Sequence, residues 1–152
     1  FSTIHTNDAP TTINRIVDIG VPPYLVSSAL ILIQAQRLVR RICSKCREKI
    51  PVNPHLLEEA GIPPDIFPEN MVYKGRGCAT CNQTGYKGRV GLYEVMPITP
   101  ELRALILSGA NSDEIAKLAI EEGMITLRQD GIEKVKQGVT TIEELMRETV
   151  SF

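Results

Sequence analysis

The sequence predicts the tail of an α/β ligand-binding domain, followed by a tetracysteine insert and a small helical bundle. Three observations predict this order. A strand-like segment, a polar run and a helical pattern follow one another at the start of the chain, as they do in α/β folds. The four cysteines form two Cys-x-x-Cys pairs. Capping residues and glycines then punctuate residues 97–152 at helical intervals.

The first predicted part, residues 1–42, begins with a short strand that ends at Ile4. Asp8 is the expected N-cap of a helix with Pro10 in its first turn. Gly20 is expected to end this helix. The apolar stripe of the helix consists of Ile13, Ile16 and Val17.

A second helix is expected to start at Pro22 and Pro23 and to run through Ile33. It is apolar nearly all round, so it should be buried between other elements. Residues 37–42 then form a strand that leads to the first cysteine pair. His5 lies at the end of the first strand, where open α/β sheets bind ligands. From position alone, it is either a ligand-binding residue or a capping or core histidine.

The cysteine spacing is the most specific chemical signal in the chain. Cys43 and Cys46 form one pair, Cys78 and Cys81 form the other, and 31 residues separate the pairs. Two such pairs supply the four thiolates of a tetrahedral zinc site. A thioredoxin-like redox motif needs only one pair, and a disulfide framework is typical of smaller, cysteine-dense secreted chains. Four-cysteine iron sites use the same ligands, so spacing alone leaves iron open.

The second predicted part, residues 43–96, is this metal-binding module and its return strand. A short helix is expected at residues 54–60, ended by Gly61. Residues 86–89 resemble a turn, and residues 89–95 alternate as in a strand. His55 could replace a cysteine ligand, but with four cysteines present we expect it to be exposed.

The third predicted part, residues 97–152, consists of about four short helices. Thr99 caps the first, with Pro100 at its first position. Gly123 and Gly138 close the second and third helices. Three pairs resemble capping boxes, and they are Asn111 with Glu114, Thr126 with Gln129 and Thr141 with Glu144.

Composition limits the possible functions. The 152 residues are 43% apolar and carry a net charge of −1, which disfavours non-specific nucleic-acid binding. The basic residues nevertheless gather around the cysteine pairs, either as a solvated surface or as a contact for an anion or an acidic protein. These residues are Arg37, Arg40, Arg41, Lys45, Arg47, Lys49, Lys74, Arg76, Lys87 and Arg89.

The location of the protein is predicted by what the sequence lacks. Its most apolar stretch, residues 24–33, is too short to span a bilayer. The sequence also does not begin with a signal-peptide pattern. Paired reduced cysteines then indicate the cytoplasm. Phe1 is not a natural start, so we expect a fragment of a longer protein.

Several blocks of the sequence resemble the secretion ATPases that drive type IV pilus assembly and type II secretion (the PilB and GspE family). Residues 2–9 resemble their His box, and residues 36–46 and 78–94 resemble the entry to and exit from their metal-binding module. The blocks at residues 123–131 and 138–144 resemble their C-terminal helical region. The individual blocks are moderately specific, but their order is highly specific and covers essentially the whole chain.

The resemblance implies a hexameric RecA-like motor that hydrolyses ATP with Mg²⁺ and moves an inner-membrane platform protein. It implies a cytoplasmic protein that is peripheral at the inner membrane. His5 would face the γ-phosphate region of the nucleotide, as the His box does in the family. Arg89 is a weaker candidate for nucleotide binding. Arg15 is either a subunit-interface residue or an exposed helix charge.

The sequence departs from the family in one respect, because it contains no Gly-x-x-x-x-Gly-Lys-Ser/Thr motif and no acidic boxes for Mg²⁺. Activity therefore belongs to the parent protein, and the fragment alone is expected to be inactive. Pilus assembly is favoured over type II secretion by residues 110–128. Two alternatives without an ATPase role are a zinc-ribbon nucleic-acid-binding module and a zinc-dependent chaperone or adaptor module.

Overall fold

The computed structural model describes residues 2–149, which fold into two compact units. The first unit comprises Phe1–Gln36 and Tyr93–Leu127, and the second comprises Arg37–Leu92 and Arg128–Phe152. The helices are α1 (Ala9–Asp18), α2 (Pro23–Ala29), α3 (Pro54–Ala60), α4 (Pro100–Leu107), α5 (Ser112–Glu121), α6 (Leu127–Lys136) and α7 (Ile142–Glu148). The strands are β1 (Leu32–Ile42), β2 (Arg47–Pro51), β3 (Met71–Gly75) and β4 (Tyr86–Pro97).

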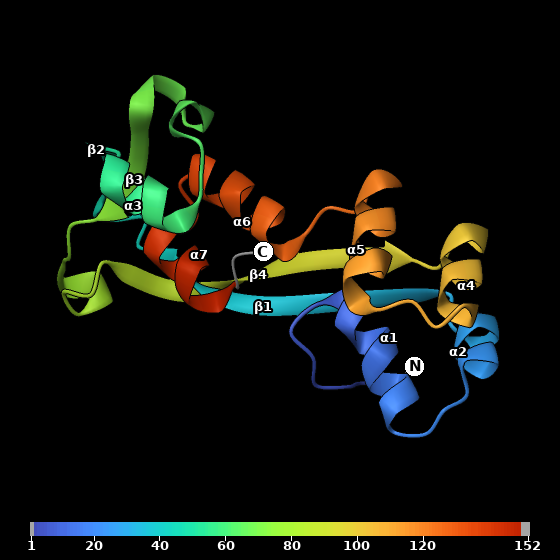
Figure 1. Cartoon of the computed structure of the whole chain (residues 1–152). Coiled ribbons are helices and arrows are strands. Elements are labelled where there is room, and N and C mark those ends of the chain that lie inside the picture. The colour runs from blue at the N-terminus through green and yellow to red at the C-terminus, as the bar shows by residue number, and fades with distance from the viewer. Residues whose placement is uncertain (1, 150–152) are drawn as a thin grey trace. The chain divides into compact units, whose positions relative to one another are not determined.

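Two pairs of strands form two separate sheets. Strands β1 and β4 are hydrogen-bonded neighbours (Figure 1), and each is divided between the two units. Strands β2 and β3 form an antiparallel hairpin within the second unit, with Arg47 opposite Gly75 and Pro51 opposite Met71. Both sheets have only two strands, so packing against helices must supply most of their stability.

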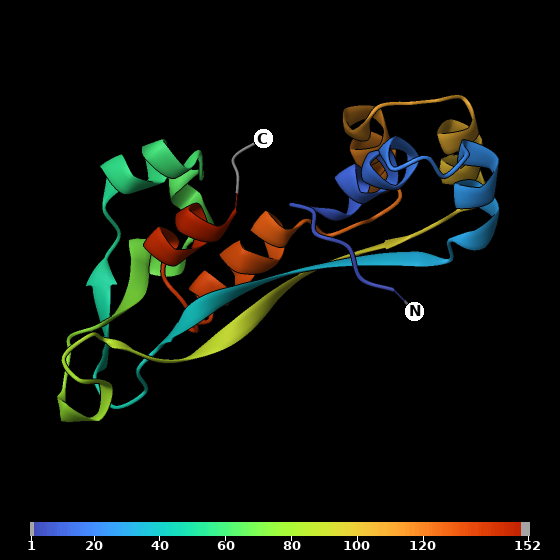
Figure 2. The same cartoon turned by 90° about the horizontal axis from the view of Figure 1, so that it is seen from below.

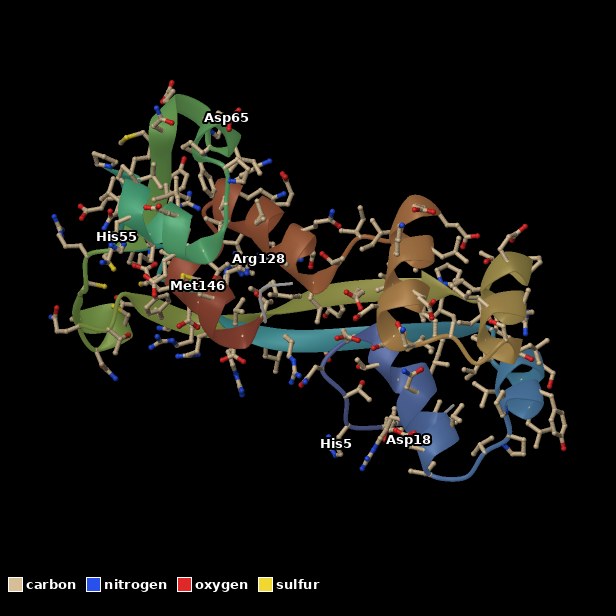
Figure 3. All side chains as sticks on the ribbon, viewed as in Figure 1. His5, Asp18, His55, Asp65, Arg128 and Met146 are labelled. Atoms are coloured by element: carbon tan, nitrogen blue, oxygen red, sulfur yellow. The ribbon has the colours of Figure 1, made fainter. Side chains whose placement is uncertain are left out.

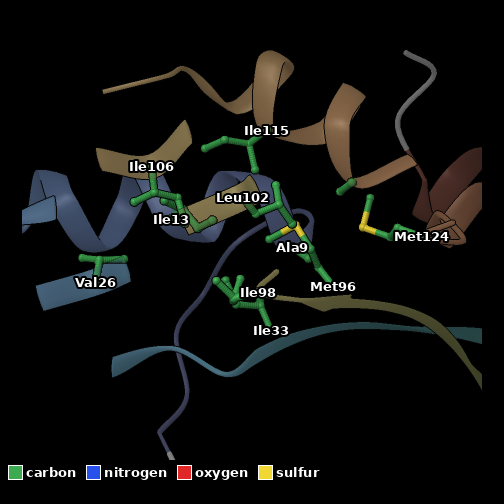
Figure 4. Close-up of a cluster of buried hydrophobic side chains, with 11 residues drawn as sticks. Ala9, Ile13, Val26, Ile33, Met96, Ile98, Leu102, Ile106, Ile115 and Met124 are labelled. Atoms are coloured by element: carbon green, nitrogen blue, oxygen red, sulfur yellow. The ribbon is translucent and has the colours of Figure 1, made fainter. Parts of the chain in front are cut away.

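The core of the first unit lies among helices α1, α2, α4 and α5 (Figure 4). The sequence starts α1 as predicted, because the Asp8 carboxylate accepts a hydrogen bond from the Thr11 N–H at 2.8 Å. Burial of the apolar stripe then holds the helices together. The buried side chains are Ala9, Ile13, Val26, Ile33, Met96, Ile98, Leu102, Ile106, Ile115, Ala119 and Met124.

Three predictions for the first unit are wrong. The second helix ends at Ala29, and Ile33 lies in strand β1 because that segment pairs with β4. This helix is not buried all round, since Tyr24 is 61% exposed. The short strand that was expected to end at Ile4 is absent, because residues 2–6 have no regular structure and pair with no strand of the described chain.

The second unit gathers α3, α6, α7 and the β2–β3 hairpin (Figures 1 and 2). Helix α3 ends at Gly61, which adopts a φ of 61° as a left-handed cap. The helix also has a tertiary anchor, because the Arg128 guanidinium of α6 donates to the Ala60 carbonyl. The turn predicted at residues 86–89 is wrong, since strand β4 already begins at Tyr86.

The four predicted C-terminal helices are all present as α4 to α7. Thr99 caps α4 through the Leu102 N–H, and Asn111 with Glu114 forms a complete capping box on α5. The Thr141 hydroxyl caps α7. Helices α4 and α5 belong to the first unit, whereas nearly all of α6 and all of α7 belong to the second. A single C-terminal bundle therefore stays a prediction, as does the division at residues 42 and 96.

Among residues 2–149, no helix has the length and apolar character that crossing a membrane requires.

Candidate metal centre

The four cysteines converge on one point in the second unit. The Sγ atoms of Cys43, Cys46, Cys78 and Cys81 all lie within 4.8 Å of one another. The Sγ distances are 3.9 Å from Cys43 to Cys78, 3.9 Å from Cys46 to Cys81 and 3.7 Å from Cys78 to Cys81. All four are free thiols rather than disulfides.

These distances match a metal-binding tetrahedron. Zn–S bonds of about 2.3 Å place neighbouring sulfur atoms of a tetrahedral site about 3.8 Å apart. Three of the four residues are buried and Cys78 is half-buried. These three separations therefore fit one tetrahedral ion, and the four thiol ligands favour zinc or iron over a harder metal.

Backbone hydrogen bonds connect each Cys-x-x-Cys turn to the segment that flanks the other turn. The Cys43 N–H donates to the Gly85 carbonyl at 2.9 Å, and the Arg76 N–H donates to the Cys46 carbonyl at 3.0 Å. Each turn is closed internally as well, since the N–H of Cys46 reaches the Cys43 carbonyl and that of Cys81 reaches the Cys78 carbonyl. The protein backbone thus sets the separation of the four sulfurs.

A glycine pair makes this close approach of the two segments possible. A Cβ on Gly75 would lie 2.0 Å from the Gly85 carbonyl oxygen, and a Cβ on Gly85 would lie 2.4 Å from the Gly75 carbonyl oxygen. Neither backbone atom can move aside as a flexible side chain would. The glycine that trails the second cysteine pair is therefore a structural part of the metal centre.

Backbone N–H groups point at two of the sulfurs. Gly77 donates to Cys46 Sγ at 3.3 Å, and both Cys78 and Gly85 donate to Cys81 Sγ at 3.3 Å. Burial opposes charge on Cys81, but these backbone hydrogen bonds outweigh it and lower the Cys81 pKa to about 6. Burial raises the pKa of Cys46 to about 12. A bound cation would release the protons that remain on the thiols.

An ion pair supports the strands that flank the cysteines. The Arg40 guanidinium donates to Glu144 Oε1 from Nε at 2.9 Å and from Nη2 at 2.6 Å, and the Arg40 backbone N–H donates to Oε2 at 2.9 Å. The guanidinium lies 4.2 Å from the centre of the Tyr86 ring, within cation–π range. Arg40 precedes the first cysteine pair and Tyr86 follows the second. The contacts among Arg40, Tyr86 and Glu144 therefore connect the segments that flank the two cysteine pairs.

The turn between α6 and α7 also packs against the metal module. The Ile42 N–H donates to the Val139 carbonyl at 2.9 Å. The Arg47 guanidinium lies 4.8 Å from the centre of the Tyr73 ring and donates to the Gly138 carbonyl at 3.3 Å. The C-terminal helices therefore anchor the metal module within the second unit.

These contacts change the interpretation of the basic cluster. Arg40 and Arg47 hold the fold together, and Lys49 pairs with Glu69 at 3.5 Å between exposed side chains. Other cations near the cysteines, including Arg41, Lys45, Arg76, Lys87 and Arg89, are exposed.

The predicted nucleotide-contacting residues belong to different units. His5 is exposed in the first unit (Figure 3), whereas Arg89 is exposed in strand β4 of the second. Arg15 is exposed on α1. Their roles therefore stay predictions. His55 is exposed on α3, as expected, and is not one of the metal-binding residues.

Two carboxylates were missed by the sequence reasoning. Glu94 is 3% exposed and Glu144 is 1% exposed, and the sequence reasoning predicted burial for neither. For Glu94 a signal existed, because Leu92 and Met96 share its face of strand β4 at the period-two spacing of a strand. For Glu144 the only local signal was its place at the third position of a capping box.

We predict that the chain carries one zinc ion. Cys78→Ala should remove the metal and unfold the insert, because the energy of binding at such sites is energy of folding. Thr80→Ala is the matched control, since Thr80 lies exposed between the two cysteines and should leave the metal in place. Elemental analysis and circular dichroism measure both effects. An iron-loaded chain, or one without metal, would contradict the prediction.

The Glu144 ion pair predicts a loss of stability in acid. Burial would raise the Glu144 pKa, but hydrogen bonds from Arg40 outweigh it and hold the pKa below its usual range. The pair therefore stabilises the fold above the unfolded pKa of about 4.3, and this contribution is lost as pH falls through the lower folded value. Glu144→Gln should cost about 2 kcal/mol at pH 7, since Arg40 is half-exposed.

Chemical denaturation between about pH 7 and pH 3 measures this dependence. The gap in stability between wild type and Glu144→Gln should narrow on acidification. Glu143→Gln is the control, because Glu143 is the exposed neighbour on α7. An equal loss for both variants, or a gap independent of pH, would show that the Glu144 pair does not carry the effect.

The chain is similar to known proteins over nearly its whole length. The family described as "Type II/IV secretion system protein" matches residues 1–147. The chain is 44% identical over 149 residues to the type IV pilus assembly ATPase PilB of Myxococcus xanthus, covering 97% of this chain and 26% of that protein. It is 41% identical to the PilB of Thermus thermophilus, covering 98% of this chain and 17% of that protein.

A type II secretion relative is similar to the same degree. The chain is 42% identical over 148 residues to type II secretion system protein E of Pectobacterium carotovorum, covering 97% of this chain and 29% of that protein. The chain thus spans less than a third of the length of these relatives. Since the family match extends over nearly every residue, this chain belongs to the family of type II/IV secretion system proteins.

Proposed function

We propose that this chain is the C-terminal part of an ATPase that powers type IV pilus extension. The observation that carries the proposal is the match of the whole chain to relatives named as pilus assembly ATPases. The chain is almost equally similar to a pilus assembly ATPase and to a type II secretion protein, at 44% and 42% identity. The alternative function is therefore that the parent ATPase powers type II secretion. The pilus kind is preferred on the sequence of residues 110–128.

The metal would be a structural zinc ion in this function. Four thiolates complete a tetrahedral shell and leave no open position for a substrate or water. The ion's chemistry is then to cross-link Cys43 and Cys46 to Cys78 and Cys81. The chain's contribution to the motor is accordingly a rigid module, held on its helices by the Arg40 and Arg47 contacts.

ATP hydrolysis would belong to the longer parent protein. In this proposal the parent is a hexamer of RecA-like domains that binds ATP and Mg²⁺. This chain supplies neither the phosphate-binding glycine loop nor the acidic boxes for the metal ion. We propose that it supplies His5 near the γ-phosphate and Arg89 as a second contact to nucleotide. Arg15, exposed on α1, is proposed to face a neighbouring subunit.

The exposed cations near the metal module would be the docking face of this motor. Their proposed partner is an inner-membrane platform protein or a regulator with an acidic surface. Binding to the platform protein would hold the parent protein at the cytoplasmic side of the inner membrane. Support comes from the residues that remain exposed after Arg40 and Arg47 are used by the fold. They are Arg41, Lys45, Arg76 and Lys87.

The purified 152-residue chain is expected not to hydrolyse ATP. Phosphoryl transfer depends on a phosphate cradle and a bound Mg²⁺, and the sequence carries the motifs of neither. A coupled assay of phosphate release, with the parent protein as the positive control, measures this. Metal-dependent turnover by the chain alone would contradict the proposed division of labour.

His5→Ala in the parent protein should lower ATP turnover by roughly tenfold or more, which is the typical worth of a positioned acid–base or electrostatic group. ATP affinity and hexamer assembly should change little, because a contact made mainly in the transition state affects kcat more than ground-state binding. His55→Ala is the matched control, since His55 is exposed on the metal module. Normal turnover in His5→Ala would remove this histidine from the site.

A further inference from the structure

Glu94 is a buried carboxylate that joins the starts of two helices. Its side chain is on the inward face of β4, and the residue is 3% exposed. Oε1 accepts a hydrogen bond from the Ala9 N–H at 2.7 Å, and Oε2 accepts one from the Leu127 N–H at 3.1 Å. Ala9 is the first residue of α1 and Leu127 is the first residue of α6.

Both bonds are made to groups that a helix cannot satisfy itself. The first N–H groups of a helix have no partner within it, and a side-chain cap reaches the second or third residue. In α1, Asp8 takes the Thr11 N–H and Glu94 takes the Ala9 N–H. A negative carboxylate at two helix N-termini is also favoured by both helix dipoles.

The start of α1 in turn holds the segment that carries His5. The Thr6 hydroxyl donates to the Asp8 carbonyl at 3.2 Å and lies 2.8 Å from the Thr12 hydroxyl. His5 is the residue immediately before Thr6. The backbone next to His5 therefore depends on the first turn of α1, which Glu94 fixes.

We propose that Glu94 is a positioning residue that fixes the His5 segment by holding the Ala9 and Leu127 amides on one carboxylate. This inference rests on the proposed role of His5 in ATP hydrolysis. Leu127 is the last residue of the first unit, and the rest of α6 lies in the second. The contacts of Glu94 with Ala9 and Leu127 lie within the first unit. A shift at either amide would break its hydrogen bond to the shared carboxylate, so the position of the His5 segment depends on Glu94.

A double-mutant cycle in the parent protein tests the path through His5. Glu94→Gln keeps the shape of the side chain but replaces one acceptor oxygen with a donor, so one of the two helix starts loses its partner. It should lower ATP turnover about tenfold with little change in KM for ATP. Combined with His5→Ala, it should cause no further loss, because both changes remove the same contact.

The outcome of this cycle separates positioning from general stability. Losses that multiply in the double variant, or normal turnover in Glu94→Gln, would overturn the proposal. Glu121→Gln is the matched control, because Glu121 is an exposed carboxylate of the same unit. It should leave turnover unchanged.

Amide hydrogen exchange gives a readout that does not depend on ATP hydrolysis. In the wild-type protein, the Ala9 and Leu127 amides should exchange at least tenfold more slowly than the Ser112 amide. Ser112 is also the first residue of its helix, but the Asn111 cap bonds the two residues after it. This comparison stands even if Glu94→Gln fails to fold. Equal exchange at all three amides would overturn the positioning role.

A parent protein without ATP turnover would refute the proposed function and leave the exchange result to decide the role of Glu94. Slow exchange at Ala9 and Leu127 in such a protein would still show that Glu94 holds these two amides. Rapid exchange at both amides would refute that role, whatever the ATP turnover of the protein.

Discussion

The second unit depends on four sulfur atoms meeting at one point. Its insert contains a hairpin of two five-residue strands and a seven-residue helix, and hairpins of this size are marginal in water. Structural zinc sites contribute on the order of 10 kcal/mol or more of folding energy. A metal ion held by the thiolates would supply stability that so small a core cannot, and the rest of the module brings the four sulfur atoms together.

The backbone around the sulfurs shows how that arrangement is reached. The contact between Gly75 and Gly85 lets two segments approach closer than any side chain would allow. Hydrogen bonds from Cys43 and Arg76 then fix the register of the two turns. Metal binding and backbone pairing thus favour the same geometry, which is what a single well-defined state requires.

Much of the local structure could be predicted from the sequence, because its causes lie within a few residues. The N-caps Asp8, Thr99 and Asn111 act on amides two or three positions away. The metal centre was predictable for a related reason, since Cys-x-x-Cys brings two sulfurs together by itself. Only the meeting of the two pairs is long-range, and the absence of other cysteines made that pairing the natural expectation.

The parts that sequence reasoning missed are those decided by distant partners. The end of α2 at Ala29 follows from the pairing of β1 with β4, which overrides an apolar run typical of a helix. Arg40 was counted among surface cations, because Glu144 lies 104 residues away in the chain. No local pattern states that these two residues meet, although the strand alternation around Glu94 did indicate its burial.

The two buried carboxylates share one physical logic. Each would be costly as an isolated charge, and each is kept by donors from two separate segments. Glu144 accepts hydrogen bonds from Arg40 and Arg147, whereas within residues 2–149 Glu94 accepts them from backbone amides. Burial accordingly raises the Glu94 pKa despite those hydrogen bonds, while the pKa of Glu144 stays low.

That difference separates two kinds of structural role. A carboxylate bound by a guanidinium is a fixed cross-link, because the opposite charge stays with it. A carboxylate held only by backbone amides stays in place while two helices keep their starts against it. Movement of either helix leaves a buried charge without a donor, which the fold resists. Glu94 therefore holds the start of α1 and the Leu127 amide on one carboxylate within the first unit.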